Sequence, residues 1–414
     1  MQDSVLCANS VELSKLEKSL YNHGLGHTQT IEDICFSRAE GDELIDVDGT
    51  RYIDFNGTLN LPLGHVSQHA LNAFSCGLPL NAVSYATTER VQLCLELQDL
   101  FPGYTAFQFY SAGTEANEGA IRYAIAITGK DGFCSFEKSY HGRTRATVSL
   151  CSMKPYNGTR LPNYHQLPYP ADDREAEETL RALENLLTSD NGTKVAGVFV
   201  EPILGKLVIA PPEGFLPQLR ALCDRFGILL IADEYLTSIR TGAYSACLSQ
   251  GVIPDIMTIG KCLGNGIPFA VLMCHSSVAE KVWTVKGSTT FGGNPPACRA
   301  VRQTIEELKS QHLPERAVRL IEPVFREATL PLLDCALVTE IRARGALLGI
   351  AMRDRETCID LCRRYVKAGV LVSCIKNVVR ITPSLTIPEQ VLRRGLHAIV
   401  RETLAAAEDR PCGA

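Results

Sequence analysis

The sequence predicts an α/β protein whose main domain is a doubly wound, mostly parallel sheet. Short apolar segments of strand length, such as residues 195–200 and 228–232, alternate with longer helical segments such as 86–101. Two apolar segments end abruptly in charge, one at Asp233 and one at Lys261. Such alternation builds a parallel sheet, because each helix carries the chain back to the edge at which the next strand begins.

The N-terminal part is predicted to contain a helix over residues 11–22 and a hairpin over 42–56. Asp48-Gly49 favours a tight turn between two short strands. After it, helices are expected over 86–101 and 174–188. Strands of the large domain are expected at 107–110, 132–136, 147–150, 195–200, 228–232, 256–259 and 270–274.

The C-terminal part predicts a second, smaller domain. Residues 300–327 have the pattern of one long amphipathic helix. The segments 337–352, 356–368, 370–382 and 388–408 then predict strand, helix, strand and helix.

The composition indicates a soluble enzyme that acts on small molecules. The 414 residues allow two or three domains, and 45% hydrophobic content is enough for large cores. The 41 basic and 46 acidic residues give a net charge of −5, so neither a nucleic acid nor a membrane is an expected partner. No apolar run reaches the roughly 20 residues that a membrane helix needs.

The 16 cysteines include no Cys-x-x-Cys pair and no zinc-type spacing with histidine. The N-terminus has no basic-then-apolar signal segment. We therefore expect reduced, mostly buried thiols, no bound metal and a cytoplasmic location.

The two strand-end charges predict a shared site. Open α/β sheets bind ligands beyond the carboxyl ends of their strands, so Asp233 and Lys261 are expected to lie close together. A lysine that forms a Schiff base and an aspartate that keeps a pyridinium protonated are what pyridoxal phosphate chemistry requires. For Lys261 taken alone, an ordinary surface lysine is the alternative.

A third feature is an anion site upstream. An aromatic strand at 107–110 enters Ser111-Ala-Gly113-Thr114 and then a helix, whose first backbone N–H groups attract phosphate. Alternatively, Ser111 or Thr114 only caps that helix. A nucleotide-binding loop before Lys261 is excluded, because Asp255 stands where its first glycine is needed.

Taken together, the motifs resemble those of the class III aminotransferases, the ornithine, acetylornithine and 4-aminobutyrate group among the fold-type I pyridoxal phosphate enzymes. The resemblance runs from about Glu40 to Thr386. Its motifs are Asp46 to Phe55, Ser111 to Asn117, Tyr140 to Thr144, Glu201-Pro202, Asp233-Glu234, Gly260-Lys261, Thr290 to Pro295 and Val379-Arg380.

The resemblance implies a fold-type I transferase with a large domain and a smaller, discontinuous α+β domain. The large pyridoxal phosphate-binding domain is expected over residues 59–305. The small domain is expected to combine an N-terminal segment, 1–58, with the C-terminal residues 306–414.

The resemblance also assigns cofactor contacts. Gly113 and Thr114 are expected at the phosphate, Tyr140 stacked on the pyridine ring, and Asp233 at the ring nitrogen. Thr290 is expected to reach the phosphate of the adjacent subunit, which implies a homodimer.

Substrate carboxylates are assigned by the resemblance to Arg143 and Arg380. Glu201 matches a glutamate that pairs with the second arginine and swings away, so that an ω-amine and a 2-oxo acid can share one pocket. The alternative for each of these residues is a structural salt bridge.

Departures from the family pattern crowd the expected pocket. Tyr235 and Leu236 follow Asp233-Glu234, where the family usually has a valine behind the cofactor ring and a glutamine near its phenolic oxygen. Tyr235 is thus also an expected cofactor contact. We therefore do not expect a standard ornithine or 4-aminobutyrate enzyme.

The predicted function is ping-pong transfer of an amino group from an amino acid or ω-amine to a 2-oxo acid. The alternative within the fold is an enzyme without net transfer, namely an aminomutase, a racemase or epimerase, or a decarboxylase. A second alternative is a protein that binds pyridoxal phosphate but has lost turnover, although retention of Lys261, Asp233 and both arginines argues against it.

Overall fold

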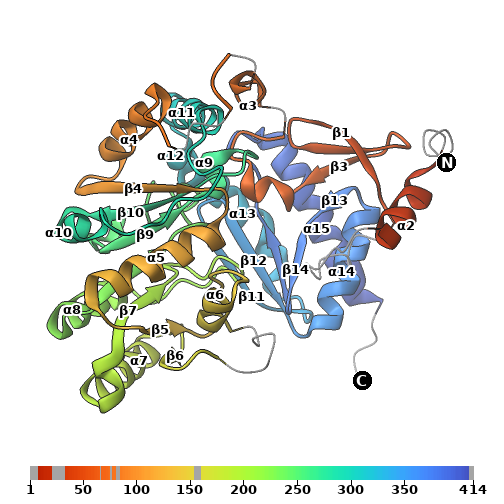
Figure 1. The fold of residues 1–414 in the computed structure, drawn as a ribbon. Coiled ribbons are helices and arrows are strands. Elements are labelled where there is room, and N and C mark those ends of the chain that lie inside the picture. The colour runs from red at the N-terminus through yellow and green to blue at the C-terminus, as the bar shows by residue number, and fades with distance from the viewer. Residues whose placement is uncertain are drawn as a thin grey trace. The chain divides into compact units, whose positions relative to one another are not determined.

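The computed structural model describes most of the chain, in two compact units. The described residues are 8–20, 33–65, 67–74, 77–80, 84–152 and 160–409. Unit 1 contains Met1–Ser67 and Glu315–Ala414, and unit 2 contains Gln68–Pro314. Each unit has its own sheets and helices (Figure 1).

Unit 2 is built on a seven-stranded sheet with the order β4-β10-β9-β8-β7-β5-β6. The pairs from β9 to β6 are parallel, and only β10 runs against its two neighbours. The predicted mostly parallel sheet is confirmed. Its strands are β4 (Tyr104–Tyr110), β5 (Gly132–Phe136), β6 (Tyr164–Leu167), β7 (Val195–Val200), β8 (Leu229–Asp233), β9 (Ile256–Ile259) and β10 (Ala270–His275).

Every residue of β7, β8 and β9 is buried. Their Val, Ile and Leu side chains suit a strand that is covered on both faces. Helix α5 (Gly113–Thr128) packs against β9 and β10, next to which it is drawn in Figure 1. The other helices of unit 2 are α3 (Gln68–Ala73), α4 (Thr88–Leu100), α6 (Arg145–Leu150), α7 (Asp173–Thr188), α8 (Phe215–Phe226), α9 (Lys261–Gly264), α10 (Ser276–Ala279) and α11 (Pro295–Ser310).

Unit 1 joins the two ends of the chain through two four-stranded sheets. One has the order β1-β2-β3-β13, in which β3 pairs in parallel with β13, and the other has the order β11-β12-β15-β14. The strands are β1 (Phe36–Glu40), β2 (Glu43–Asp46), β3 (Arg51–Asp54), β11 (Val338–Arg344), β12 (Leu347–Met352), β13 (Val370–Leu371), β14 (Ser373–Ile375) and β15 (Val378–Ile381). The helices are α2 (Ser10–Leu20), α13 (Glu322–Thr329), α14 (Arg355–Lys367) and α15 (Glu389–Glu408), and α12 (Leu313–Arg316) spans the boundary with unit 2.

The hairpin predicted around Asp48-Gly49 is confirmed, because β2 and β3 pair in antiparallel and Gly49 has a φ of 89°. The C-terminal strands are shorter than predicted. Residues 337–352 form a hairpin that turns at Gly345, which also has a positive φ, and residues 370–382 form three short strands.

Two predicted elements are wrong. Residues 147–150 belong to helix α6, not to a strand, because the Thr147 hydroxyl accepts a hydrogen bond from the Thr144 amide at 3.1 Å and closes the first helical turn. The long helix predicted over 300–327 is interrupted after Ser310, where His312 adopts a φ of 50°. A turn of that hand cannot continue a right-handed helix.

The central sheet leaves no room for a side chain at Gly197, in the middle of β7. A Cβ atom at this position would lie 2.6 Å from the backbone oxygen of Leu229 on β8. That atom belongs to the strand ladder and cannot rotate away.

We therefore expect Gly197→Ala to lower the free energy of unfolding by about 1–3 kcal/mol, the usual effect of overpacking. Urea unfolding followed by circular dichroism would measure it. Gly264→Ala is the matched control, because its Cβ would meet only an ordinary contact at 3.5 Å. Equal stability of the two variants would contradict this account of β7.

Candidate active site

The start of α5 follows directly from the end of β4. Its N-cap residue is Ala112, whose side chain makes no capping hydrogen bond, and Gly113 is the first helical residue. The Ser111 amide donates to Glu115 Oε2 at 2.9 Å. Neither Ser111 nor Thr114 is therefore the cap of this helix, and its first amides point to the edge of the sheet at which β4 ends.

Asp233 is the last residue of β8 and is 5% exposed. Its Oδ2 atom accepts hydrogen bonds from His141 Nδ1 at 2.8 Å and Asn117 Nδ2 at 2.7 Å, and its Oδ1 atom accepts one from the Tyr235 amide at 3.1 Å. Burial by itself raises the pKa of this carboxyl, but the His141, Tyr235 and Asn117 donors outweigh it and hold the pKa below its usual value. The group is therefore a buried, ionised carboxylate.

Asn117 connects Asp233 to two further elements. Its amide nitrogen also donates to the His141 carbonyl at 2.8 Å, and its carbonyl oxygen accepts from Thr258 Oγ1 at 2.8 Å. Thr258 lies on β9, directly opposite Asp233. The sequence singled out neither Asn117 nor His141 as a support of Asp233, and the only signal was their presence in the motifs at 111–117 and 140–144.

Lys261 begins the short helix α9, immediately after β9 and Gly260. Its Nζ atom lies over the Tyr235 ring, 4.6 Å from the ring centre. The same ring packs on two glycines: a Cβ at Gly260 would lie 1.8 Å from Tyr235 Cε2, and a Cβ at Gly113 2.8 Å from Cγ. The start of α5, the end of β8 and Lys261 therefore meet around Tyr235.

A second cluster surrounds Tyr140. Its amide donates to Glu201 Oε1 at 2.7 Å, and its hydroxyl accepts from Arg143 Nε at 3.0 Å. The Nζ atom of Lys206 lies 3.4 Å from the centre of the Tyr140 ring. No role for Lys206 follows from the sequence alone, where its only signal is its place four residues after the Glu201-Pro202 motif.

Glu201 is 5% exposed, and its Oε2 atom accepts a second backbone hydrogen bond from Gly205 at 3.1 Å. Burial raises the pKa of this carboxyl, although nearby His141 and the two amides oppose the shift. The carboxylate of Glu234 likewise accepts from two backbone amides, those of Ala246 at 2.6 Å and Cys247 at 3.0 Å. Glu234 therefore holds a loop in place.

The two remaining predicted residues lie in different units. Thr290, in unit 2, is exposed, and so is its neighbour Phe291. Arg380, in unit 1, is buried on β15, where Nη2 donates to Ser373 Oγ at 3.4 Å. The other predicted site residues, Gly113, Thr114, Tyr140, Arg143, Glu201, Asp233, Tyr235 and Lys261, all belong to unit 2.

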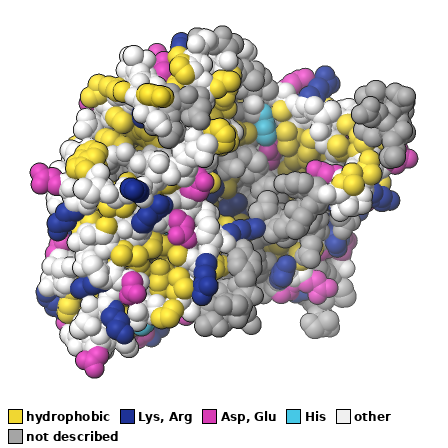
Figure 2. Space-filling view, in the orientation of Figure 1, with side chains coloured by type: hydrophobic (Ala, Val, Ile, Leu, Met, Phe, Trp, Pro, Cys, Tyr) yellow, Lys and Arg dark blue, Asp and Glu magenta, His cyan; other side chains and the backbone are white. Residues whose placement is uncertain are grey.

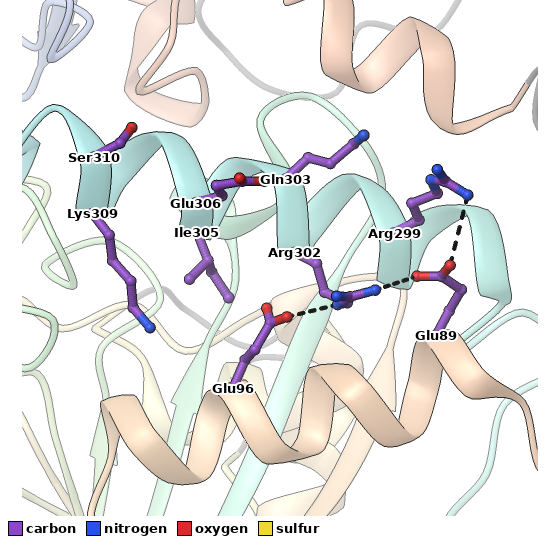
Figure 3. A pocket seen from close by; sticks show the side chains of 9 residues that line it. All are labelled: Glu89, Glu96, Arg299, Arg302, Gln303, Ile305, Glu306, Lys309 and Ser310. Carbon is purple, nitrogen blue, oxygen red and sulfur yellow. Dashed lines mark hydrogen bonds and ion pairs between the residues drawn. The ribbon is translucent and has the colours of Figure 1, made fainter.

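A groove of about 750 Å³ between α4 and α11 contains none of these residues (Figure 3). Arg302 pairs across it with Glu89 at 2.8 Å and Glu96 at 2.7 Å, and Glu89 also lies 3.7 Å from Arg299. These charges neutralise one another. Basic and acidic side chains are likewise interspersed over the face shown in Figure 2.

The thirteen described cysteines are free, and ten of them are buried and three partly buried. Cys358 and Cys362, one turn apart on α14, and Cys374 on β14 have Sγ atoms within 4.8 Å of one another.

No helix in the described part of the chain is long and apolar enough to cross a membrane.

The residues of unit 2 fit pyridoxal phosphate. An ionised carboxylate, a lysine amine and a helix start without a side-chain cap match the three charged or reactive parts of that cofactor, which are the protonated ring nitrogen, the aldehyde and the phosphate. Together with the sheet, this arrangement defines a pyridoxal phosphate-dependent enzyme of fold type I.

Comparison with known proteins identifies the family. The family model for class III aminotransferases matches residues 25–402, and the chain belongs to this family. An acetylornithine aminotransferase from Methanothermobacter thermautotrophicus is 33% identical over 392 residues, which cover 92% of this chain and 96% of that protein. A 4-aminobutyrate aminotransferase from Mycobacterium leprae is 30% identical, with 95% of each chain covered.

Solved structures agree. The ornithine aminotransferase from Toxoplasma gondii superposes with a TM-score of 0.87 at 25% identity, covering 99% of this chain and 98% of that chain. The resemblance inferred from the motifs, the fold class, the type of enzyme and the cofactor are confirmed.

The bond between His141 and Asp233 makes a testable contribution to stability. Because the pKa of Asp233 is lowered in the folded state, its stabilising contribution is present above the pKa of the unfolded chain and is lost as pH falls through the folded pKa. We expect His141→Ala to lower the free energy of unfolding at neutral pH by about 1–3 kcal/mol.

The difference from wild type should shrink as the pH is lowered toward the folded pKa of Asp233. Urea unfolding at a series of pH values would measure it. His397→Ala, at an exposed position of α15, is the control and should have little effect. A loss that does not change with pH would mean that His141 acts by packing alone.

Proposed function

We propose that Lys261 and Asp233 are the catalytic residues with which this enzyme moves an amino group from an amino acid or ω-amine to a 2-oxo acid by a ping-pong mechanism. The observation that carries the proposal is the meeting of an ionised, buried Asp233, the Lys261 amine and the start of α5 in one unit.

The cofactor supplies an aldehyde that combines with amines and a pyridine ring that accepts electrons. Asp233 would hold the proton on the ring nitrogen, and His141 and Asn117 keep its carboxylate ionised and oriented. Lys261 would hold the aldehyde between turnovers and, once released by the donor, move protons at the reacting carbon. Gly113 and Thr114 would bind the phosphate with backbone amides at the start of α5.

We further propose that the active enzyme is a homodimer in which Thr290 of the partner subunit completes the phosphate site. Apolar surface in unit 2 supports a second copy: Val91 and Leu95 share a face of α4 at 53% and 56% exposure, and Phe291 beside Thr290 is 61% exposed. Such side chains are usual where two protein surfaces meet.

The small domain predicted over residues 1–58 and 306–414 overlaps unit 1, Met1–Ser67 with Glu315–Ala414, and we propose that unit 1 serves as this domain. The many reduced thiols support a cytoplasmic location.

For substrate binding, we propose that Tyr140 covers one face of the cofactor ring while Arg143 and Arg380 receive carboxylates. Arg143 already donates to the Tyr140 hydroxyl, so the two side chains would act together. Glu201 would mask Arg380 when an ω-amine binds. It is held by the amides of Tyr140 and Gly205, so any movement of Glu201 must break two hydrogen bonds.

The donor is not decided by family membership, because relatives are named for acetylornithine, 4-aminobutyrate and putrescine. The donor would be identified by adding amines one at a time and measuring the loss of cofactor absorbance with each. Coupled amination of an oxo acid means transfer, whereas product without an acceptor means an aminomutase, racemase or decarboxylase. Cofactor binding without either means an inactive protein.

The role of Lys261 can be tested by chemical trapping. Borohydride should fix pyridoxal phosphate to Lys261 and to no other lysine, as peptide mass spectrometry would show. Lys261→Ala should keep the fold and lose the label, together with at least about 10³-fold in turnover. Lys206→Ala is the matched control, because Lys206 is a second lysine of unit 2 placed over an aromatic ring. A label on Lys206 would overturn the assignment.

The carboxylate switch predicts opposite effects of two substitutions. Arg380→Ala should slow the oxo-acid half-reaction by about 10²-fold or more and leave an ω-amine half-reaction much less affected, since a charge-assisted pair is lost only with the acid. Glu201→Gln should favour ordinary α-amino acids over ω-amines.

Single-turnover measurements of both half-reactions in each variant would decide this. If each substitution slows the two halves equally, Glu201 and Arg380 have structural roles, and an enzyme without a shared acceptor site is favoured.

A further inference from the structure

Tyr235 lies against both groups that are proposed to hold the ends of the cofactor. Its ring centre is 4.6 Å from Lys261 Nζ. A Cβ at Gly113 would be 2.8–2.9 Å from Cγ, Cδ1 and Cδ2 of the ring, so Gly113 lies over the ring face. The phenol therefore lies beside the proposed aldehyde-binding amine and the proposed phosphate-binding helix start.

The hydroxyl of Tyr235 also reaches polar backbone. It donates to the Phe269 carbonyl at 3.4 Å, which holds the ring in this position.

Pyridoxal phosphate has the same spatial requirement as this side chain. Its aldehyde and its phosphate arm are attached to neighbouring carbons of one six-membered ring. If the aldehyde is at Lys261 and the phosphate is at Gly113, the pyridine ring therefore has to lie close to both residues. Carbon atoms of two rings cannot approach more closely than about 3.5 Å.

On the assumption that the proposed function is right, we propose that the Tyr235 side chain competes with pyridoxal phosphate for the space between Gly113 and Lys261. Loading of the cofactor then displaces the phenol, and the residue sets the affinity of the enzyme for its cofactor.

The backbone permits such a movement. The Tyr235 amide is held by Asp233 Oδ1 at 3.1 Å, and this bond does not depend on the side-chain torsion. The ring is only partly buried, and in the proposed movement it would rotate about its first side-chain bond while the β8 backbone stays in place. Asp233 would keep its place while the ring moves.

The sign of an affinity change tests this competition. Apparent affinity falls in proportion to the fraction of molecules in the binding-competent state, so a phenol that blocks the site nine-tenths of the time weakens binding about tenfold. We expect Tyr235→Val, which removes the ring, to tighten the dissociation constant of pyridoxal phosphate about tenfold. Tyr235→Phe removes only the hydroxyl and should give a smaller gain, about threefold.

The measurement is equilibrium dialysis of full-length protein stripped of cofactor, supported by the rise in melting temperature with added pyridoxal phosphate. Neither readout depends on turnover. Tyr164→Phe is the matched control, because Tyr164 is also a partly buried tyrosine packed on the core of unit 2, where its ring contacts Phe133. Its dissociation constant should equal that of wild type.

Weaker binding in Tyr235→Val would overturn the proposal, since it would mean that the ring supports the cofactor by stacking. Equal affinity in wild type, Tyr235→Val and Tyr235→Phe would overturn it as well. If Tyr235→Val fails to fold, the direction of change in Tyr235→Phe decides. Borohydride labelling of wild-type Lys261 separates a failure of the competition from a failure of the proposed function. If Lys261 is labelled but the variants do not bind pyridoxal phosphate more tightly, only the competition is refuted. If the wild type neither binds pyridoxal phosphate nor is labelled, the proposed function is refuted too.

Discussion

The rest of the site depends on the buried carboxylate of Asp233. A charge that is 5% exposed at the end of a strand is unfavourable unless donors surround it, and His141, Asn117 and the Tyr235 amide supply them. Each donor comes from a different part of unit 2. Stabilising this one charge therefore also fixes the turn at 140–142, the start of α5 and the chain after β8 in one arrangement.

The mostly parallel sheet makes this convergence possible. The strands β8 and β9 end at the same edge, so Asp233 and the Gly260-Lys261 pair emerge side by side, with Thr258 and Asn117 linking the two strands to α5. The glycines at 113 and 260 let the chain approach closely enough for one side chain, Tyr235, to touch both. That contact gives the departure at Tyr235 a physical consequence, which is direct contact with the groups that would hold the cofactor.

Sequence reasoning was most accurate where burial is uniform and least accurate where local hydrogen bonds decide. The segments at 132–136, 195–200 and 256–259 match β5, β7 and β9, because continuous apolar runs bounded by turns have one favourable placement in such a sheet. Residues 147–150, Thr-Val-Ser-Leu, are also buried, yet the Thr144 and Thr147 pair starts a helix there. The interruption of the predicted 300–327 helix at His312 is likewise a local backbone event that hydrophobic periodicity does not report.

The sequence by itself determined the family, the α/β class and the chemistry of Lys261 and Asp233 as candidates, because residue types at strand ends and the order of motifs are properties of the chain alone. The tertiary structure decided which residues support them. His141 and Asn117 lie 92 and 116 residues from Asp233 along the chain, and Tyr235 meets Gly113 across a similar separation. Hydrogen bonds and ring contacts act over a few ångströms in space, so only the folded chain could reveal these partners.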